Sequence, residues 1–182
     1  MDKKETIQVS KFLSLVLRHD PGSIGLTLDH QGWTSIDSLI TCASQHGMHL
    51  DRESIGTIVR ESEKQRFALS EDGGSIRANQ GHSVEVDLGY VPTAPPDLLY
   101  HGTAEKHLAS IREQGLIKGE RRHVHLSADS DTAFKVGQRH GRPVVLLVDS
   151  ATMSREGAIF FRSANGVWLT DHVPAQRLRE QQ

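Results

Sequence analysis

Cysteine, net charge and long apolar runs are scarce in this chain of 182 residues. Cys42 is the only cysteine, so an internal disulfide is excluded and a zinc site built on thiolates would need a second chain. We therefore expect a reducing compartment and no metal. No stretch approaches the roughly 20 apolar residues that span a bilayer, and the N-terminus lacks the apolar segment of a secretory signal. These absences predict a soluble, cytoplasmic protein.

The charges nearly cancel, because 21 Lys and Arg stand against 23 Asp and Glu, and the formal net charge is −2. A chain without an overall basic field must hold nucleic acid through a local group of cations. This balance disfavours duplex binding as the main role. The content of 36% hydrophobic and 24% charged residues is typical of a globular protein, and the length fits one domain or two small lobes. The order of the motifs favours two lobes.

The first half of the chain predicts a helix, a strand, two helices and a hairpin, an order that resembles a winged helix. Gly47 stands where a helix C-cap belongs, and Asp51 can cap the helix after it. The expected elements are an amphipathic helix from Val9 that Pro21 and Gly22 end, a strand over 24–29, helices over 36–46 and 51–61, and strands over 66–69 and 75–78.

Residues 88–97 include Pro92, Pro95 and Pro96, whose fixed backbone angles and missing N–H donors do not suit a core element. We place the lobe boundary there, with lobes of residues 1–90 and 91–182. Beyond the boundary, short apolar runs predict strands at 98–100, 124–126, 144–148, 159–161 and 167–169, and helices over 104–114 and 131–138. The expected fold class is α+β.

Basic residues stand at three of these junctions. Arg18 and His19 end the first helix, Arg66 precedes an apolar strand, and Arg121 and Arg122 precede another. Guanidinium groups match phosphate oxygens bidentately, so a phosphate could bridge such arginines, and an imidazole adds a titratable group. The alternative for an isolated Arg-His pair, or for Arg66 on a hairpin, is an ordinary solvated surface.

Histidines mark a second group of candidates. Residues 100–103 close a predicted strand before a helix, where a glycine lets backbone approach a ligand and the neighbouring side chains can hydrogen-bond a ribose or an amide. His123 and His125 flank Val124 and point to opposite faces of a strand, so they cannot both bind one metal without distortion. His82 could equally be a structural histidine.

In this order, the segments resemble the RNA 2′-phosphotransferase family over most of the chain. The resemblance is carried by residues 10–14 with Arg18 and His19, by residues 64–67, 76–83, 100–103 and 165–169, and by Arg121 with the His-Val-His-Leu-Ser run at 123–127.

The family implies a winged-helix lobe for RNA and phosphate, joined to an ADP-ribosyltransferase-like lobe with a mixed β-sheet that holds NAD⁺. Arg121 is assigned to the phosphate site instead of Arg122, because the family places its arginine two positions before the first histidine of the run. The resemblance implies a phosphate site of Arg18, His19, Arg66 and Arg121, NAD⁺-binding residues His101, Gly102, Thr103, His125 and Ser127, and interlobe or substrate residues Asn79, Gln80 and His82.

The implied reaction consumes NAD⁺ and has two steps. The internal 2′-phosphate of a tRNA-like RNA, as in tRNA splicing, attacks the nicotinamide-bearing ribose carbon, nicotinamide leaves, and a 2′-phospho-ADP-ribosylated RNA forms. The neighbouring ribose hydroxyl then attacks phosphorus, which gives 2′-OH RNA and ADP-ribose 1″,2″-cyclic phosphate. A phosphate is already a nucleophile, so the first step needs no general base. We expect a monomer.

Two other functions remain as alternatives. An ADP-ribosyltransferase could modify protein or a terminal nucleic-acid phosphate, although Val167 stands where transferases that modify protein have a catalytic glutamate. A non-enzymatic winged-helix module could bind duplex DNA, but its third helix, 51–61, carries three acidic residues against Arg52 and Arg60.

Overall fold

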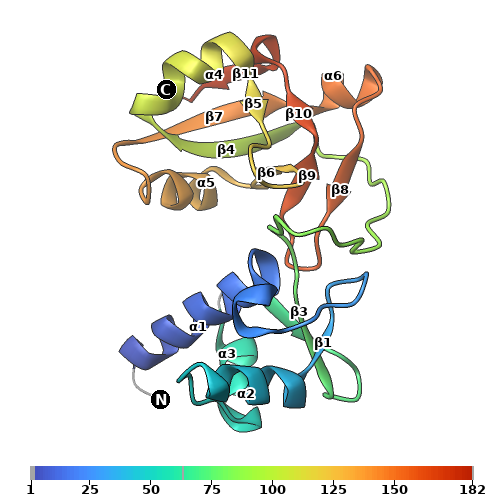
Figure 1. The fold of residues 1–182 in the computed structure, drawn as a ribbon. Helices are drawn as coiled ribbons and strands as arrows, with labels where there is room; N and C mark the ends of the chain where they lie inside the picture. Colours follow the sequence, from blue (N-terminus) through green and yellow to red (C-terminus); the bar gives the residue numbers. More distant parts are fainter. Residues whose placement is uncertain (1–2, 63, 182) are drawn as a thin grey trace. The chain divides into compact units, whose positions relative to one another are not determined.

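The computed structural model describes residues 3–62 and 64–181, and the chain forms two compact units, Met1–Gly89 and Tyr90–Gln182 (Figure 1). Every strand pair in the described residues is antiparallel, so the fold is α+β with several small sheets. The expected mixed sheet is therefore wrong. Within the described residues, no helix combines the length and apolar character needed to cross a membrane.

The first unit packs helices against one small sheet. The strands run in the order β1-β3-β2, and β2 and β3 form the predicted hairpin. Its elements are α1 (Lys3–Arg18), the 3₁₀ helix η1 (Pro21–Ile24), β1 (Thr34–Ser35), α2 (Ile36–Gln45), α3 (Arg52–Glu61), β2 (Phe67–Leu69) and β3 (Ser75–Ala78).

Both α2 and α3 begin at the residues that the sequence pattern predicts. The Asp51 carboxylate accepts a hydrogen bond from Ser54 N at 2.7 Å, and Ser54 Oγ accepts one from Asp51 N at 3.1 Å, which forms a reciprocal capping box. Hydrogen bonds from the backbone and the side chain of Ser54 to the carboxylate lower the pKa of Asp51. Gly47, with a φ of +77°, follows α2 in the left-handed conformation expected after a helix end.

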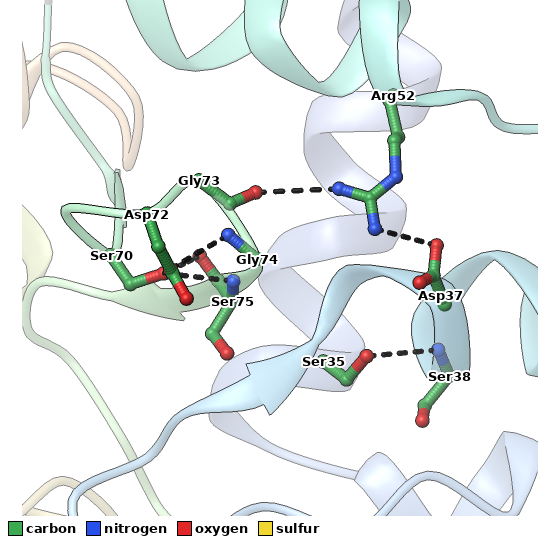
Figure 2. A network of polar contacts seen from close by, with 9 residues as sticks. All are labelled: Ser35, Asp37, Ser38, Arg52, Ser70, Asp72, Gly73, Gly74 and Ser75. Carbon is green, nitrogen blue, oxygen red and sulfur yellow. Dashed lines mark hydrogen bonds and ion pairs between the residues drawn. The ribbon is translucent and has the colours of Figure 1, made fainter.

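A polar network ties the starts of α2 and α3 to the β2–β3 turn (Figure 2). Arg52 donates to Asp37 at 2.7 Å and to the carbonyl oxygen of Gly73 at 3.4 Å. Within the turn, Asp72 accepts hydrogen bonds from the Ser70 hydroxyl and from Gly74 N. The exposed polar residues of this region thus hold the hairpin to the helices.

The core of the first unit is built on the apolar face of α1. Val9, Leu13, Val16 and Leu17 are all at most 4% exposed, as their helical spacing predicts. Burying a leucine side chain of this kind stabilises the fold by about 1.5–3 kcal/mol. The last turn of α1 is therefore held in the core, and this fixes the positions of Arg18 and His19 at the end of the helix.

The strand predicted over residues 24–29 is wrong. Asp20 accepts a hydrogen bond from Ser23 N at 3.0 Å, and Pro21 begins the 3₁₀ helix η1. Gly25 then ends η1 with a left-handed φ of +68°. Ile24 and Leu26 are both buried, so their alternation reflects a loop that inserts two apolar side chains into the core.

The second unit combines short antiparallel sheets with helices. Its main sheet has the order β11-β7-β4, a second has the order β6-β9-β8, and β5 pairs with β10. The elements are β4 (Leu98–Ala104), η2 (Glu105–His107), α4 (Leu108–Gln114), β5 (Leu116–Ile117), β6 (Val124–Leu126), α5 (Ser130–Gly137), β7 (Pro143–Asp149), α6 (Ser150–Arg155), β8 (Phe160–Arg162), β9 (Trp168–Thr170), β10 (His172–Val173), η3 (Ala175–Arg177) and β11 (Leu178–Glu180).

Strand β4 runs past residue 100 to Ala104, so residues 101–103 form its last part, as predicted for residues that close a strand before a helix. Their partners are Leu146, Val145 and Val144 of β7. The helix predicted over 104–114 begins only after this strand, first as η2 and then as α4. The candidate residues 101–103 therefore lie in a strand that is paired with β7.

Helix α5 packs closely on β4, and a pair of glycines makes this possible (Figure 1). A Cβ atom at Gly102 would lie 1.7 Å from the carbonyl oxygen of Ala133 in α5. A Cβ atom at Gly137 would lie 2.6 Å from the carbonyl oxygen of Thr103. We expected Gly102 to let a ligand approach the backbone, but it is α5 that approaches there.

Candidate functional site

The C-terminal end of α1 is wrapped by the segment of residues 79–84. The backbone N–H groups of Ser83 and Val84 donate to the carbonyl oxygen of Arg18 at 2.9 and 3.2 Å. The Ser83 hydroxyl lies 3.0 Å from His19 Nδ1. At Gly81, whose φ is +87°, a Cβ atom would lie 3.6 Å from Arg18 Nη1. These contacts fix the helix end that carries both candidate residues.

Arg18 reaches from α1 to the residue before β2. Its Nη2 donates to the carbonyl oxygen of Arg66 at 3.3 Å, and its guanidinium carbon lies 5.8 Å from the centre of the Phe67 ring. The ring face adds a weak cation–π attraction. Two of the predicted phosphate-site residues, 48 positions apart in the sequence, therefore lie side by side.

Asn79 holds the backbone on which Arg66 stands. Its N–H donates to the carbonyl oxygen of Arg66 at 2.9 Å, and its Nδ2 donates to that of Gln65 at 2.6 Å. Gln65 has a φ of +40°, a left-handed conformation that costs a residue with a side chain roughly 1–2 kcal/mol. Asn79 is only 7% exposed. These contacts give Asn79 a positioning role, which the residue pattern did not predict; its assignment to the substrate stays a prediction.

The Ser83 contact selects a tautomer of His19. The serine hydroxyl also lies 3.4 Å from the carbonyl oxygen of Arg18, an atom that can only accept. Because the hydroxyl has one hydrogen, donation to that carbonyl leaves its oxygen to accept from His19 Nδ1–H. The ring is then anchored through Nδ1.

His82 and Gln80 belong to the same wrapping segment. The His82 side chain is 2% exposed, and its Nε2 would lie 3.4 Å from a Cβ atom at Gly32. Gln80 is half-buried. The burial of His82 is that of a structural histidine, the alternative that the sequence left open, while the substrate role of both residues stays a prediction.

In the second unit, His101 is held as a neutral imidazole. Its Nδ1 lies 3.0 Å from the carbonyl oxygen of His125, and since a carbonyl can only accept, Nδ1 carries the proton. Burial lowers the pKa of His101; the hydrogen bond to His125 opposes this, and the charges of His140 and Arg121 add to it. Nε2 is therefore an acceptor at neutral pH, suited to a hydroxyl or amide donor.

The two neighbouring arginines act on different histidines. The charge of Arg121 helps to lower the pKa of His101, whereas that of Arg122 acts on His123, whose pKa is lowered first of all by burial. Both arginine side chains are exposed. The charge of Arg121 thus acts on a predicted NAD⁺-binding residue, while its assignment to the phosphate site over Arg122 stays a prediction.

The remaining NAD⁺ candidates divide into two groups. Ser127 exchanges two backbone hydrogen bonds with Tyr100, at 2.9 and 2.7 Å, so it joins β4 to the end of β6 beside His101 and His125. Thr103 is 6% exposed, and like Gly102 it lies against α5. The structure therefore brings His101, His125 and Ser127 together, and it gives the other two a packing role.

His123 lies in an aromatic cluster with Tyr90 and Phe161. Its ring centre is 6.3 Å from that of Tyr90 and 5.5 Å from that of Phe161. The carbonyl group of His125, by contrast, contacts His101. Over the described ranges 3–62 and 64–181, no three His, Cys, Asp or Glu residues form a group that could hold a metal ion.

Comparison with known proteins gives a consistent result. Residues 4–172 match the model of the family described as "RNA 2′-phosphotransferase, Tpt1 / KptA family". A protein of Acaryochloris marina is 56% identical over 168 residues, which cover 92% of this chain and 93% of that protein. A protein of Pseudomonas aeruginosa strain PAO1 is 53% identical over 181 residues, which cover 99% of this chain and 100% of that protein. Both are named "Probable RNA 2′-phosphotransferase".

Proposed function

Because the chain belongs to the RNA 2′-phosphotransferase family, we propose that it removes an internal 2′-phosphate from RNA by transferring it to NAD⁺. The observation that carries this proposal is the group formed by Arg18, His19 and Arg66. Hydrogen bonds to the segment 79–84 and from the Arg18 guanidinium to the Arg66 backbone carbonyl hold it together. Guanidinium groups and an imidazole suit a phosphate dianion and its proton transfers.

The first step requires the phosphate to be held, not activated. Arg18 and Arg66 bind its oxygens and align one of them with the nicotinamide-bearing ribose carbon. A bond from this phosphate oxygen to the ribose carbon forms as the bond to nicotinamide breaks, and nicotinamide leaves with the bonding electrons. No hydroxyl proton has to be removed, so no general base is needed.

The second step places the larger demand on these residues. A ribose hydroxyl attacks phosphorus and loses its proton to solvent, the bond to the RNA 2′-oxygen breaks, and that oxygen must gain a proton. His19, anchored through Nδ1, donates this proton from Nε2. Arg18 and Arg66, joined in the proposal by Arg121, stabilise the charge on the phosphoryl oxygens.

The residues of the second unit fit a nicotinamide dinucleotide chemically. The acceptor Nε2 of His101 suits a ribose hydroxyl or a carboxamide N–H, and the nearby cation Arg121 suits a phosphate. We assign His101, His125 and Ser127 to direct contact, with Gly102 and Thr103 supporting them from the packed side of β4. NAD⁺ supplies the electrophilic ribose carbon and is consumed.

The fold supports the same division of roles. The first unit has the element order α1-β1-α2-α3-β2-β3 with a sheet order of β1-β3-β2, and we propose that it is a winged-helix lobe for RNA. We propose that the second unit is an ADP-ribosyltransferase-like lobe for NAD⁺. A tRNA-like substrate, a monomeric protein and a cytoplasmic location complete the proposal.

The test is incubation of the full chain with NAD⁺ and a short RNA that carries one internal 2′-phosphate. The proposal expects dephosphorylated RNA, nicotinamide and ADP-ribose 1″,2″-cyclic phosphate in equal amounts. RNA with no 2′-phosphate is the matched control and should release no nicotinamide. Nicotinamide release with the RNA phosphate left in place would instead support an ADP-ribosyltransferase.

A further inference from the structure

We infer that a groove between α1 and the end of α3 holds the RNA strand that flanks the 2′-phosphate. The groove has a volume of about 920 Å³, and its wall includes His19 and Arg66. It is therefore continuous with the candidate phosphate site of the same unit. The inference rests on the proposed function and adds the surface that binds the rest of the substrate.

One wall of the groove consists of two parallel stripes along α1. Thr6, Ser10 and Ser14 form a hydroxyl-bearing stripe, and Ile7, Lys11 and Leu15 form a second stripe beside it. Residues four positions apart lie above one another on a helix, so each stripe runs along the helix axis toward His19. An RNA strand that follows either stripe would therefore reach the candidate phosphate site.

The second stripe joins a cation to apolar surface. Ile7 and Leu15 are 48% and 47% exposed, and they stand on either side of the exposed Lys11. A ribose or base can pack on the apolar side chains while the lysine meets a backbone phosphate. Among the described residues that line the groove there is no Phe, Tyr or Trp for base stacking, so we expect little sequence preference.

The opposite wall of the groove also carries cations. Lys64 and Arg66 lie there, and Glu61 is the one carboxylate among the described lining residues. Ser62, at the end of α3, has a buried Oγ without a hydrogen-bond partner within the part of the chain that the structure describes. Three cations against one carboxylate favour a polyanion, and a single RNA strand is the polyanion that the phosphate site already requires.

The experiment measures RNA binding by fluorescence anisotropy without NAD⁺, so that no reaction takes place. It compares a 2′-phosphorylated dinucleotide with longer single strands that carry the same internal 2′-phosphate. In Lys11→Ala and Lys64→Ala, the affinity for the long strand should fall about 3–10-fold, and this decrease should exceed the decrease for the dinucleotide. The slope of log K against log salt should become shallower by about 0.7 for each backbone phosphate that the variant no longer neutralises.

Lys4→Ala is the matched control, because Lys4 is an exposed lysine of the same helix that does not line the groove. It should bind the long strand as the unchanged protein does. The inference is overturned if Lys11→Ala and Lys64→Ala bind the long strand normally, if their affinities fall equally for both RNA lengths, or if the affinity of Lys4→Ala falls as much. Failure of the proposed function would look different, because the unchanged protein would then bind RNA but release no nicotinamide with NAD⁺.

Discussion

The candidate residues of the two units lie in contrasting environments. In the first, Arg18, His19 and Arg66 are polar groups at element ends, held by hydrogen bonds from a wrapping segment. In the second, His101 lies within a strand, and burial lowers its pKa and keeps it neutral. The first arrangement suits an anion, and the second suits an uncharged hydroxyl or amide. The same residue type, histidine, therefore lies in a different chemical environment in each unit.

The largest effect should come from removing a cation of the first unit. In Arg66→Ala, release of dephosphorylated RNA should fall about 10²–10³-fold, the usual cost of losing one donor that stabilises developing charge. The ADP-ribosylated RNA should accumulate, because the second step needs that charge stabilisation more than the first. Single-turnover kinetics with mass detection of the RNA measures both.

Arg60→Ala is the control for this variant, since Arg60 is an exposed arginine of α3 that lies outside the groove. It should turn over at the rate of the unchanged protein. Normal product release by Arg66→Ala, with no accumulated intermediate, would contradict the role proposed for Arg66 in the second step.

The next largest effect should come from packing in the second unit. In Gly102→Ala, the added methyl group meets the α5 backbone, which cannot move as a side chain can, so the free energy of unfolding should fall by about 1–3 kcal/mol or more. Gly22→Ala in the first unit, with ordinary contacts only, should change it by less than about 1 kcal/mol. Urea unfolding of the full chain measures both, and equal midpoints for the two variants would contradict the close packing of α5 on β4.

A smaller effect should appear as a pH dependence of stability. Because the folded pKa of His101 is lowered, the unfolded chain binds a proton more readily, and stability decreases as the pH falls below about 6.5 toward the lowered folded value. Urea unfolding at about pH 7.5 and about pH 5.5 should show a smaller difference in His101→Gln than in the unchanged protein. Identical differences in both proteins would contradict a buried neutral imidazole.

The regular elements were predictable where apolar spacing was clear. The periodicity of α1, the caps at Asp51 and Gly47, and the hairpin around residues 71–74 are all confirmed. The strand predicted over 24–29 fails because alternation of two buried side chains does not distinguish a strand from an anchored loop. Strands β5, β10 and β11 were not predicted, because they are short and gain their stability from pairing partners distant in sequence.

The site was predictable in the identity of its residues more than in their physical roles. The motif pattern singled out Arg18, His19 and Arg66, and the structure brings them together. It did not reveal that Asn79 holds the carbonyl groups of Gln65 and Arg66, since those contacts involve backbone atoms. For the same reason, the role of Gly102 against α5 could not be inferred from its place in the motif.

The central claim is the proposal that Arg66 and Arg121 serve the same step of the reaction, the release of dephosphorylated RNA. The most direct test is a mass-resolved time course of Arg121→Ala with NAD⁺ and 2′-phosphorylated RNA, run beside Arg66→Ala. We predict that both variants accumulate the same ADP-ribosylated RNA and release its dephosphorylated form slowly. If Arg66→Ala accumulates this species and Arg121→Ala does not, the two arginines serve different steps and the claim is wrong.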